Sequence, residues 1–526
     1  MYATYSKKRP HKITHTAGDS ACQSGNARYR HCWSAARYHT GSIGRQPGKG
    51  AGVEYDDKEV GYYNIYILQT TKELDFQTKK ISKLVWDYAL PGIVGTMVIG
   101  LYNVVDRIFI GQVEGALAIS GLTITFPVMN LISSLGMLVG AGAAARISIS
   151  LGKRDKHTAE QILGNSLLLT VILNAIFVTQ FFIFLEPVLM AFGASELTYS
   201  YARNYLQIVL LGNVFVSLCY NFNAMMRSSG YPKKAMYTML IGAVLNIILS
   251  PIFLFVFDMG IKGVAWATVI SMFIGMLFVM HHFTRKSSVI RLRWRNVQLN
   301  KKIILSIISI GLSPFSMQVA ASGVAVLMNT SLLRYGGDLA VGAYGIINSI
   351  LMLVLMVVMG LNQGTQPIIG FNYGAGNYRR VRETLFYSLK VASIFTTTGF
   401  LIGVLFPRLI ASAFTTDVEL LNITETGARI AVTALPLVGF QIVSSSFFQS
   451  IGFAAKSIIQ SLSRQLIFLV PGILLFPRLW DLNGLWIAMP VSDTLAALLS
   501  LYLLVIQLRH LKKMEEGNPK GMPSYE

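Results

Sequence analysis

The chain has 526 residues, 53% of them hydrophobic and only 13% charged, and these proportions exclude an ordinary soluble domain. A formal net charge of +20 would fit a nucleic-acid-binding protein, but the positive residues gather in the N-terminal tail and in short loops between apolar runs. Three cysteines are too few for a disulfide framework. The composition therefore predicts a polytopic membrane protein.

Residues 1–80 differ from the rest of the chain. They are polar and basic, rich in Gly, Ser, His and Tyr, and hold no continuous apolar run that could serve as a signal peptide. We interpret them as a disordered extension. Their histidines and cysteines fit no zinc-binding spacing. No methionine occurs between Met1 and Met97, so a misassigned start, with translation beginning near Leu68, is an open alternative for residues 1–70.

Twelve apolar segments follow, each long enough to cross a bilayer as a helix, which takes about 20 residues. Six precede residue 284, at about 84–110, 117–150, 162–185, 199–228, 235–257 and 262–283. Six more follow residue 302, at about 303–334, 339–373, 384–406, 427–451, 457–480 and 483–508. We expect an all-α membrane protein with twelve transmembrane helices in two six-helix lobes: an N-terminal lobe at 81–284, a basic cytoplasmic connector at 285–302, a C-terminal lobe at 303–510 and a tail at 511–526.

The loops between these segments alternate in charge. Every second loop carries lysine and arginine, as at residues 153–156, 233–234 and 379–382, whereas the intervening loops carry acids such as Glu196 and Asp338. Loops rich in lysine and arginine stay in the cytoplasm. We therefore expect both termini to be cytoplasmic.

The two halves of the chain repeat each other at an offset of about 222 residues. The matches are landmark glycines that stand 222 positions apart, namely Gly142 and Gly364, Gly152 and Gly374, and Gly230 and Gly452. An even number of helices per repeat gives both repeats the same orientation, related by an axis along the membrane normal. Two such lobes leave a cavity between them near the midplane and work by rocking between inward- and outward-open forms.

The first span carries a polar stripe. Tyr102, Asn103 and Asp106 stand at i, i+1 and i+4 and so lie toward one side of a helix. A carboxylate at membrane depth costs roughly 2.5–3.5 kcal/mol on insertion scales, so it normally faces a cavity or a partner and indicates a function. The alternative is that Asp106 only pairs with Arg107, although neighbours on a helix diverge by about 100°.

No motif supplies another source of energy or an enzymatic reaction. The chain lacks a Gly-x4-Gly-Lys-Ser/Thr phosphate loop, a His-Glu-x-x-His motif and a Gly-x-Ser-x-Gly motif. His281 and His282 stand at the end of a span, where we interpret them as interfacial side chains. Secondary transport, without enzymatic activity and without a cofactor, is the expected function.

Several segments carry a joint signature: Tyr102-Asn-Val-Val-Asp106-Arg-Ile-Phe-Ile-Gly111, Arg227-Ser-Ser-Gly230-Tyr-Pro, Leu245-Asn246-Ile-Ile-Leu-Ser250-Pro251, Gly260-Ile-Lys-Gly263-Val-Ala-Trp-Ala-Thr268 and Gly360-Leu-Asn-Gln-Gly364-Thr-Gln-Pro367. With them, residues 75–512 resemble the multidrug and toxic compound extrusion (MATE) family of efflux transporters, in its MepA-like and DinF-like branch. The resemblance implies a monomeric antiporter of the bacterial plasma (inner) membrane. In such an antiporter H+ or Na+ enters as a cationic, amphipathic compound leaves, and this xenobiotic transport confers drug resistance.

Four residues match the cation-coupling site of that family. Asp106 matches its first-helix aspartate, and Asn246 and Thr268 match polar residues around it. Ser250 stands where many relatives have a second aspartate, which removes one of two carboxylates that would coordinate Na+. Burial in an apolar cavity favours the protonated form of the remaining carboxyl. Proton coupling at Asp106 is therefore favoured, with Na+ at Asp106 as the alternative and no other metal site expected.

The residues expected to line a substrate cavity are polar side chains of both lobes: Tyr102, Asn103, Asn223, Gln318, Asn329 and Gln363. In the C-terminal lobe, the seventh and eighth helices offer amides and hydroxyls in place of acids. The chain has 21 Met and 29 Phe, which suit a weakly specific cavity, although core packing and lipid contact account for most of them. The sequence names no individual substrate.

The alternative function is a flippase for a lipid-linked oligosaccharide or other lipid precursor, which needs basic residues in the cavity to bind an anionic headgroup. Arginines occur in or beside spans, mostly near predicted span ends where snorkelling explains them, at Arg107, Arg146, Arg227, Arg334 and Arg464. A membrane enzyme or sensor, the remaining alternative, would need a catalytic cluster or an appended soluble domain, and the sequence shows neither.

Overall fold

A computed structural model describes residues 75–192 and 195–517, except for some side chains between 103 and 127 and that of Ala191. The described residues all belong to one compact unit, Asn64–Glu526. Residues 1–74 of the extension expected at 1–80, and residues 518–526 of the predicted tail, lie outside the described residues.

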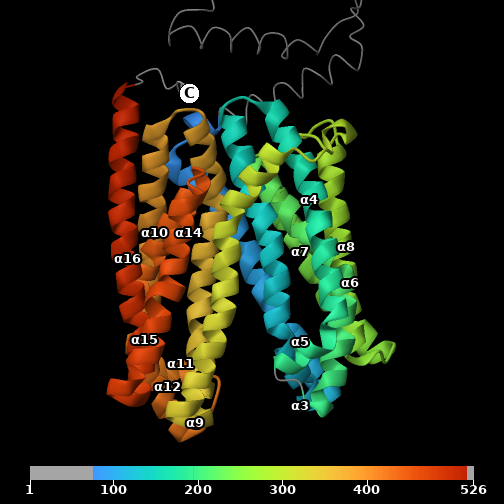
Figure 1. Cartoon of the computed structure of the whole chain (residues 1–526), viewed down its shortest axis with the longest axis vertical. Helices are drawn as coiled ribbons and strands as arrows, with labels where there is room; N and C mark the ends of the chain where they lie inside the picture. Colours follow the sequence, from blue (N-terminus) through green and yellow to red (C-terminus); the bar gives the residue numbers. More distant parts are fainter. Residues whose placement is uncertain (1–74, 193–194, 518–526) are drawn as a thin grey trace, which may run out of the picture. The chain divides into compact units, whose positions relative to one another are not determined.

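Every regular element in the described part of the chain is a helix, as the sequence predicts (Figure 1). The N-terminal half contains α3 (Ile81–Gly152), α4 (Lys156–Ile183), α5 (Leu185–Ala191), α6 (Glu196–Ser228), α7 (Pro232–Pro251), η2 (Ile252–Val256) and α8 (Gly260–Thr284). The connector contains the short η3 (Trp294–Asn296). The C-terminal half contains α9 (Lys301–Gly374), α10 (Tyr378–Leu405), α11 (Pro407–Ser412), α12 (Val418–Ala431), α13 (Leu435–Ser450), α14 (Ala454–Leu462), η4 (Ser463–Leu469), α15 (Val470–Leu475) and α16 (Pro477–Gly517).

Two of these helices are far too long for a single span. A straight helix of 72 residues such as α3 would be about 108 Å long, more than three times the hydrocarbon core of a bilayer. Within α3 two apolar spans stand apart, Ile81–Tyr102 and Val128–Gly152. The 74-residue α9 is interrupted at Gly337, whose φ of 66° is non-helical. Each of the two helices therefore supplies two spans.

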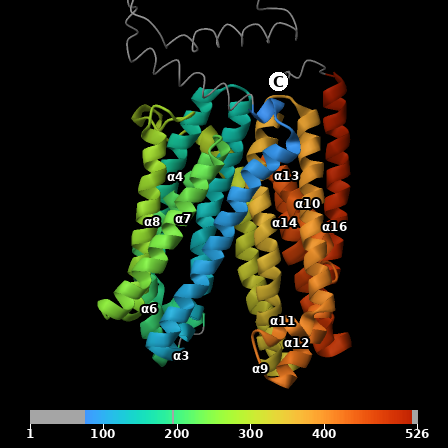
Figure 2. The ribbon, with the colours of Figure 1, turned by 180° about the vertical axis from the view of Figure 1, so that it is seen from behind.

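The number of spans agrees with the sequence. Ten helices in the described chain are long and apolar enough to cross a membrane, and α12 with α13, bent by 54°, forms an eleventh span. The division of α9 at Gly337 gives the twelfth. The spans form two six-helix lobes, with α3–α8 on the right of Figure 1 and α9–α16 on the left; Figure 2 shows the same lobes from behind.

The lobes meet where α3 packs against α9. A Cβ on Gly142 would lie 2.0 Å from the carbonyl oxygen of Ile307, and one on Gly311 would lie 1.7 Å from that of Leu138, so only glycine permits this approach. Trp86 Nε1 also donates a hydrogen bond to the Tyr387 hydroxyl at 3.1 Å. All of these contacts lie in the halves of the spans that adjoin the basic loops, so the lobes are closed on that side.

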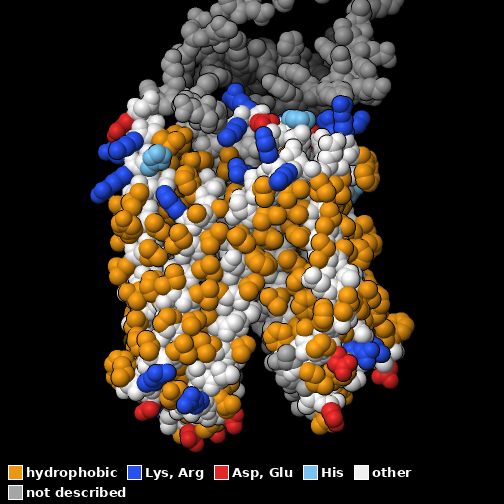
Figure 3. All heavy atoms as spheres, viewed as in Figure 1, with side chains coloured by type: hydrophobic (Ala, Val, Ile, Leu, Met, Phe, Trp, Pro, Cys, Tyr) orange, Lys and Arg blue, Asp and Glu red, His pale blue; other side chains and the backbone are white. Residues whose placement is uncertain are grey.

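The opposite halves of the lobes separate. Figure 3 shows a cleft between them that opens at the lower end of the view, where Asp and Glu side chains gather, and closes toward the upper end, where Lys and Arg predominate. Hydrophobic side chains cover the surface between the two ends. This distribution is that of a membrane-spanning bundle with unequal charge at its two faces.

The connector is attached to the N-terminal lobe through α4. The buried carboxylate of Glu160 accepts a hydrogen bond from the backbone nitrogen of Arg291 at 3.2 Å, and its Oε2 lies 3.4 Å from Nε of Arg293. A Cβ on Gly164 would lie 2.1 Å from the carbonyl oxygen of Asn296, so the connector crosses α4 in close contact. Composition alone describes this segment as a basic loop and gives no sign of the attachment.

The folded chain begins before the expected boundary at residue 80. Residues 75–78 are helical, and the Phe76 ring, only 4% exposed, stacks on Phe371 with ring centroids 4.8 Å apart. Arg380 donates hydrogen bonds from Nε to the Phe76 carbonyl at 3.1 Å and from Nη2 to the Lys79 carbonyl at 2.7 Å. A single aromatic residue among polar neighbours produces no apolar run, so its burial is visible only in the tertiary structure.

Candidate functional site

Four polar side chains of the N-terminal lobe converge on one buried carboxylate. Asp106 comes from α3, Asn246 and Ser250 come from α7, and Thr268 comes from α8. Asn246 and Ser250 are four residues apart, which puts both on the same face of α7. All four are buried, and Asp106 and Thr268 are the most accessible at 9%. The four residues predicted to form a cation-coupling site therefore lie together.

Hydrogen bonds link the four side chains in series. Ser250 Oγ donates to Asp106 Oδ1 at 2.9 Å. With the Asn246 amide turned so that its nitrogen faces the carboxylate, that nitrogen lies 3.0 and 3.2 Å from the two carboxylate oxygens, and its oxygen accepts from Thr268 Oγ1 at 3.1 Å. We adopt this orientation because the opposite one points the amide oxygen at the carboxylate, so that two acceptors face each other. In that opposite orientation the amide nitrogen donates only to Thr268.

The arrangement can hold a small cation or a proton. The ionised carboxylate receives donors from Ser250 and Asn246, and the oxygens of Ser250 and Thr268 are also potential ligands for a hard monovalent ion. Within the described residues, no group of three or more His, Cys, Asp or Glu side chains could hold a metal ion. Asp106 is the one acid among these four side chains, so a single positive charge, carried by H+ or a monovalent cation, balances the cluster.

The residues predicted to line a substrate cavity are distributed more widely. Tyr102 packs with Cys219, Ala243 and Met272 in a small apolar cluster one turn before Asp106. The Asn103 side chain lies outside the described residues. Gln318 is half-buried and Asn329 is exposed, both on α9.

Two further cavity candidates serve other contacts. Asn223 donates to the Ala235 carbonyl at 2.7 Å, accepts from Arg227, and lies beside a void of only about 10 Å³. Gln363 lies at the junction of the lobes, its Cβ 3.5 Å from where a Cβ on Gly92 would be. In the described chain, none of Asn223, Gln318, Asn329 and Gln363 shares a hydrogen bond with the Asp106 cluster.

Sequence reasoning missed an ion pair inside the C-terminal lobe. Arg464 Nε donates to Asp493 Oδ1, and both side chains are largely buried. Arg464 stands midway along the span Ala454–Leu475, so snorkelling at a span end, which explains most of the arginines beside spans, does not apply to it. The signal that could have found the pair is a charge well inside each of two neighbouring predicted segments, Arg464 in 457–480 and Asp493 in 483–508.

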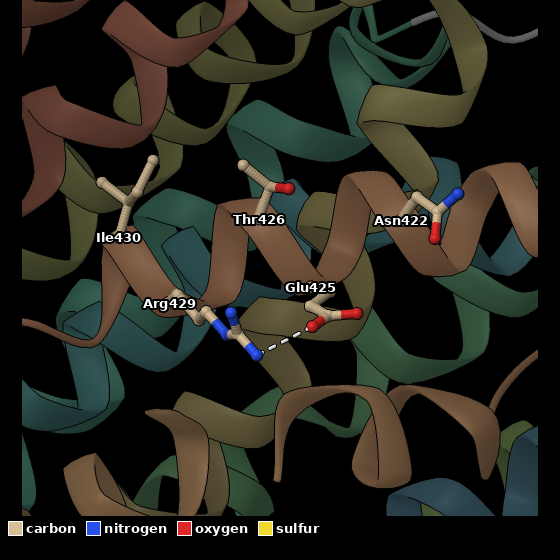
Figure 4. Close-up of a pocket in the computed structure, with 5 residues that line it drawn as sticks. All are labelled: Asn422, Glu425, Thr426, Arg429 and Ile430. Atoms are coloured by element: carbon tan, nitrogen blue, oxygen red, sulfur yellow. Dashed lines mark ion pairs between the residues drawn. The ribbon is translucent and has the colours of Figure 1, made fainter. Parts of the chain in front are cut away.

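A larger depression lies elsewhere and is not part of the Asp106 cluster. It measures about 470 Å³ and is lined by Asn422, Glu425, Thr426, Arg429 and Ile430 (Figure 4). All five residues belong to α12, and Arg429 forms an ion pair with Glu425 at 2.8 Å. A depression lined by one helix, with its charges paired, is a surface feature rather than an enclosed binding site.

The fold and the cluster define a class of protein: a helical integral membrane protein whose two six-helix lobes flank a cleft, with the buried carboxylate of Asp106 inside the first lobe. The MatE family model matches the chain twice, at residues 91–252 and 314–474, and the chain belongs to this family. The two matches begin 223 and end 222 positions apart, which confirms the internal repeat.

Known proteins of this family are similar along most of their length. The Multidrug export protein MepA of Staphylococcus aureus (strain MSSA476) is 27% identical over 440 residues, which cover 82% of this chain and 95% of that relative. A solved structure described as the outward-facing conformation of a multidrug resistance MATE family transporter of the MOP superfamily has a TM-score of 0.79 and 25% identity, covering 84% of this chain and 98% of its own. A further structure, named only as protein A, is 38% identical with a TM-score of 0.77, and covers 81% of this chain and 96% of its own.

Proposed function

We propose that this protein exports cationic, amphipathic compounds across the bacterial plasma membrane in exchange for H+. The single observation that carries the proposal is the buried Asp106 carboxylate, bound by Ser250 and Asn246 inside an apolar lobe. An ionisable group at membrane depth is costly and marks an ion or substrate pathway. The names of the relatives, a multidrug export protein and a multidrug resistance transporter, support the direction and class of the cargo.

The exchange proceeds by alternating access. The cleft opens at the acid-rich end and the α3–α9 contacts close the base-rich end (Figure 3). Basic loops face the cytoplasm, so the open end faces outward and both termini are cytoplasmic. Labelling of single cysteines in place of Lys153 and Asp338 tests this orientation. Labelling of both from the same side of the membrane would contradict it.

The proton is the preferred coupling ion because the cluster holds one carboxylate. A sodium ion prefers several oxygen ligands with negative charge among them, and Ser250 contributes a neutral hydroxyl. Protonation of Asp106 requires no second acid. Sodium bound at Asp106, Ser250 and Thr268 is the alternative that an imposed sodium gradient distinguishes.

The test is dye export from proteoliposomes under an imposed pH gradient or sodium gradient. Asp106→Asn should abolish gradient-driven export under both while retaining some dye binding. Asp87→Asn is the matched control, because it removes a partly exposed carboxylate from the same helix, 3.6 Å from Lys79 at the basic end. Normal export by the Asp106→Asn protein under either gradient would show that another group couples transport.

A lipid flippase is the other function that the fold can support. An anionic headgroup needs a net positive charge in the cleft, whereas Arg464 and Asp493 together carry no net charge. If a broad panel of cationic dyes is not exported while the protein is inserted normally, the flippase becomes the better proposal.

A further inference from the structure

The Arg464–Asp493 pair lies in the middle of the C-terminal lobe. Arg464 belongs to the π-helical segment η4, and Asp493 belongs to α16. The Arg464 side chain is 20% exposed and the Asp493 side chain 7% exposed. A π-helical turn within a helix re-aims its side chains and frequently accompanies a functional site.

The six-helix fold does not require this pair. At the repeat offset, Arg464 corresponds to Gly242, 222 positions earlier, and Asp493 corresponds to Met272, 221 positions earlier. In the N-terminal lobe these two positions also lie beside each other, since a Cβ on Gly242 would be 3.7 Å from Met272 Cε. The same contact is therefore made there without charge. Because apolar residues can replace a buried ion pair without loss of stability, the charges in the C-terminal lobe call for a function.

The pairing leaves part of the guanidinium unused. Asp493 binds Arg464 through Nε, and among the described residues Nη1 and Nη2 have no hydrogen-bond partner. Both guanidinium nitrogens carry N–H donors that can bind the two oxygens of a carboxylate. The accessible fifth of the side chain gives an incoming anionic group room to approach.

We propose that Arg464 is a binding subsite for a carboxylate carried by a transported compound, with Asp493 as the positioning residue that holds the guanidinium. This rests on the proposed export function and deepens it by naming the residue that recognises an anionic group of the cargo. Positions 242 and 272 are one helical turn, about 6 Å, from Asn246 and Thr268 on the side of the basic loops. The subsite therefore lies about one turn closer to the basic loops than the level of the Asp106 cluster.

The test compares two dyes that differ only in one carboxylate. Tetramethylrhodamine methyl ester is a cation, and its free acid is a zwitterion. Binding is measured by fluorescence anisotropy with the purified full chain, and export is measured in proteoliposomes. Arg464→Gln should weaken binding of the free acid about tenfold or more, as expected for loss of charge-assisted hydrogen bonds, and should change binding of the ester less than about twofold.

Two further variants keep the result decisive. Arg464→Gln leaves Asp493 unpaired and can harm folding, so Arg464→Gln with Asp493→Asn removes both charges and should show the same selective loss. Arg334→Gln, which removes an exposed arginine of α9, should leave both affinities unchanged.

The outcomes separate the two proposals. Equal weakening of both dyes, or unchanged binding of the free acid in the doubly neutral variant, overturns the subsite and leaves Arg464 with a structural role. Failure of the wild-type protein to export either dye counts against the export function, while the anisotropy measurement still decides whether Arg464 binds the carboxylate.

Discussion

In both lobes the last two spans lie side by side. The polar residues on these spans stand one helical turn closer to the basic loops in the C-terminal lobe than in the N-terminal lobe. At the repeat offset of 222 residues, or 221 for Thr268, the residues of the C-terminal lobe that correspond to Asp106, Asn246, Ser250 and Thr268 are Met328, Phe468, Gly472 and Met489. At the positions of Arg464 and Asp493, the N-terminal lobe has Gly242 and Met272. The repeat thus preserves which positions touch, while the side chains assign an acidic cluster to one lobe and a basic group to the other.

The largest effect is expected when the carboxylate is moved from one lobe to the other. Asp106→Asn should abolish gradient-driven export, and adding Met328→Asp in the same protein should not restore it, because Phe468 and Gly472 offer no side-chain donor to a carboxylate there. Dye export from proteoliposomes measures both variants. Recovery of export in the double variant would show that either lobe can house the coupling site.

The next largest effect is expected on the stability of the protein when the Arg464–Asp493 ion pair is broken. Asp493→Met alone should lower stability by about 3–5 kcal/mol, because it leaves the Arg464 charge buried without a partner. Arg464→Gly with Asp493→Met, which copies the N-terminal lobe, should return stability close to the wild type. Thermal unfolding in detergent measures the difference, and an equally unstable double variant would contradict the equivalence of the two helix pairs.

A second acid should change the ion that the first lobe accepts. Ser250→Asp puts two carboxylates within reach of one ion, a ligand set that suits Na+ better than a single acid. Export by this variant should respond to an imposed sodium gradient, whereas the wild type should respond to a pH gradient. A wild-type protein that already follows the sodium gradient would reverse the preference for H+.

The smallest effect is expected from Ser250→Ala. The variant loses one hydrogen bond to Asp106, while the Asn246 amide still donates to the carboxylate. Export should fall by less than about tenfold, in keeping with the loss of one hydrogen bond. Complete loss of export would show that the hydroxyl, not only the acid, binds the coupling ion.

The sequence predicted most of the fold because each membrane span corresponds to a long apolar run of residues. It also predicted which polar residues gather around Asp106, since Asn246 and Ser250 share a helix face and the resemblance linked them to Thr268. The sequence could not pair Arg464 with Asp493, because the two charges are 29 residues apart and their contact depends on how the helices pack. The burial of Phe76 could not be predicted for the same reason, because its partner Phe371 is distant in the chain.

The attachment of the connector to α4 limits the freedom of the joint between the lobes. Asn165 of α4 accepts a hydrogen bond from the backbone nitrogen of Asn300 at 2.7 Å, and the Asn300 side chain in turn caps the first turn of α9 through Lys302 and Ile303. The connector between the two lobes is therefore held against α4 up to the first turn of α9. For the alternating access proposed above, this attachment favours rotation of the lobes about Asn300 over their translation, and a small rotation there gives a large displacement at the far end of the cleft.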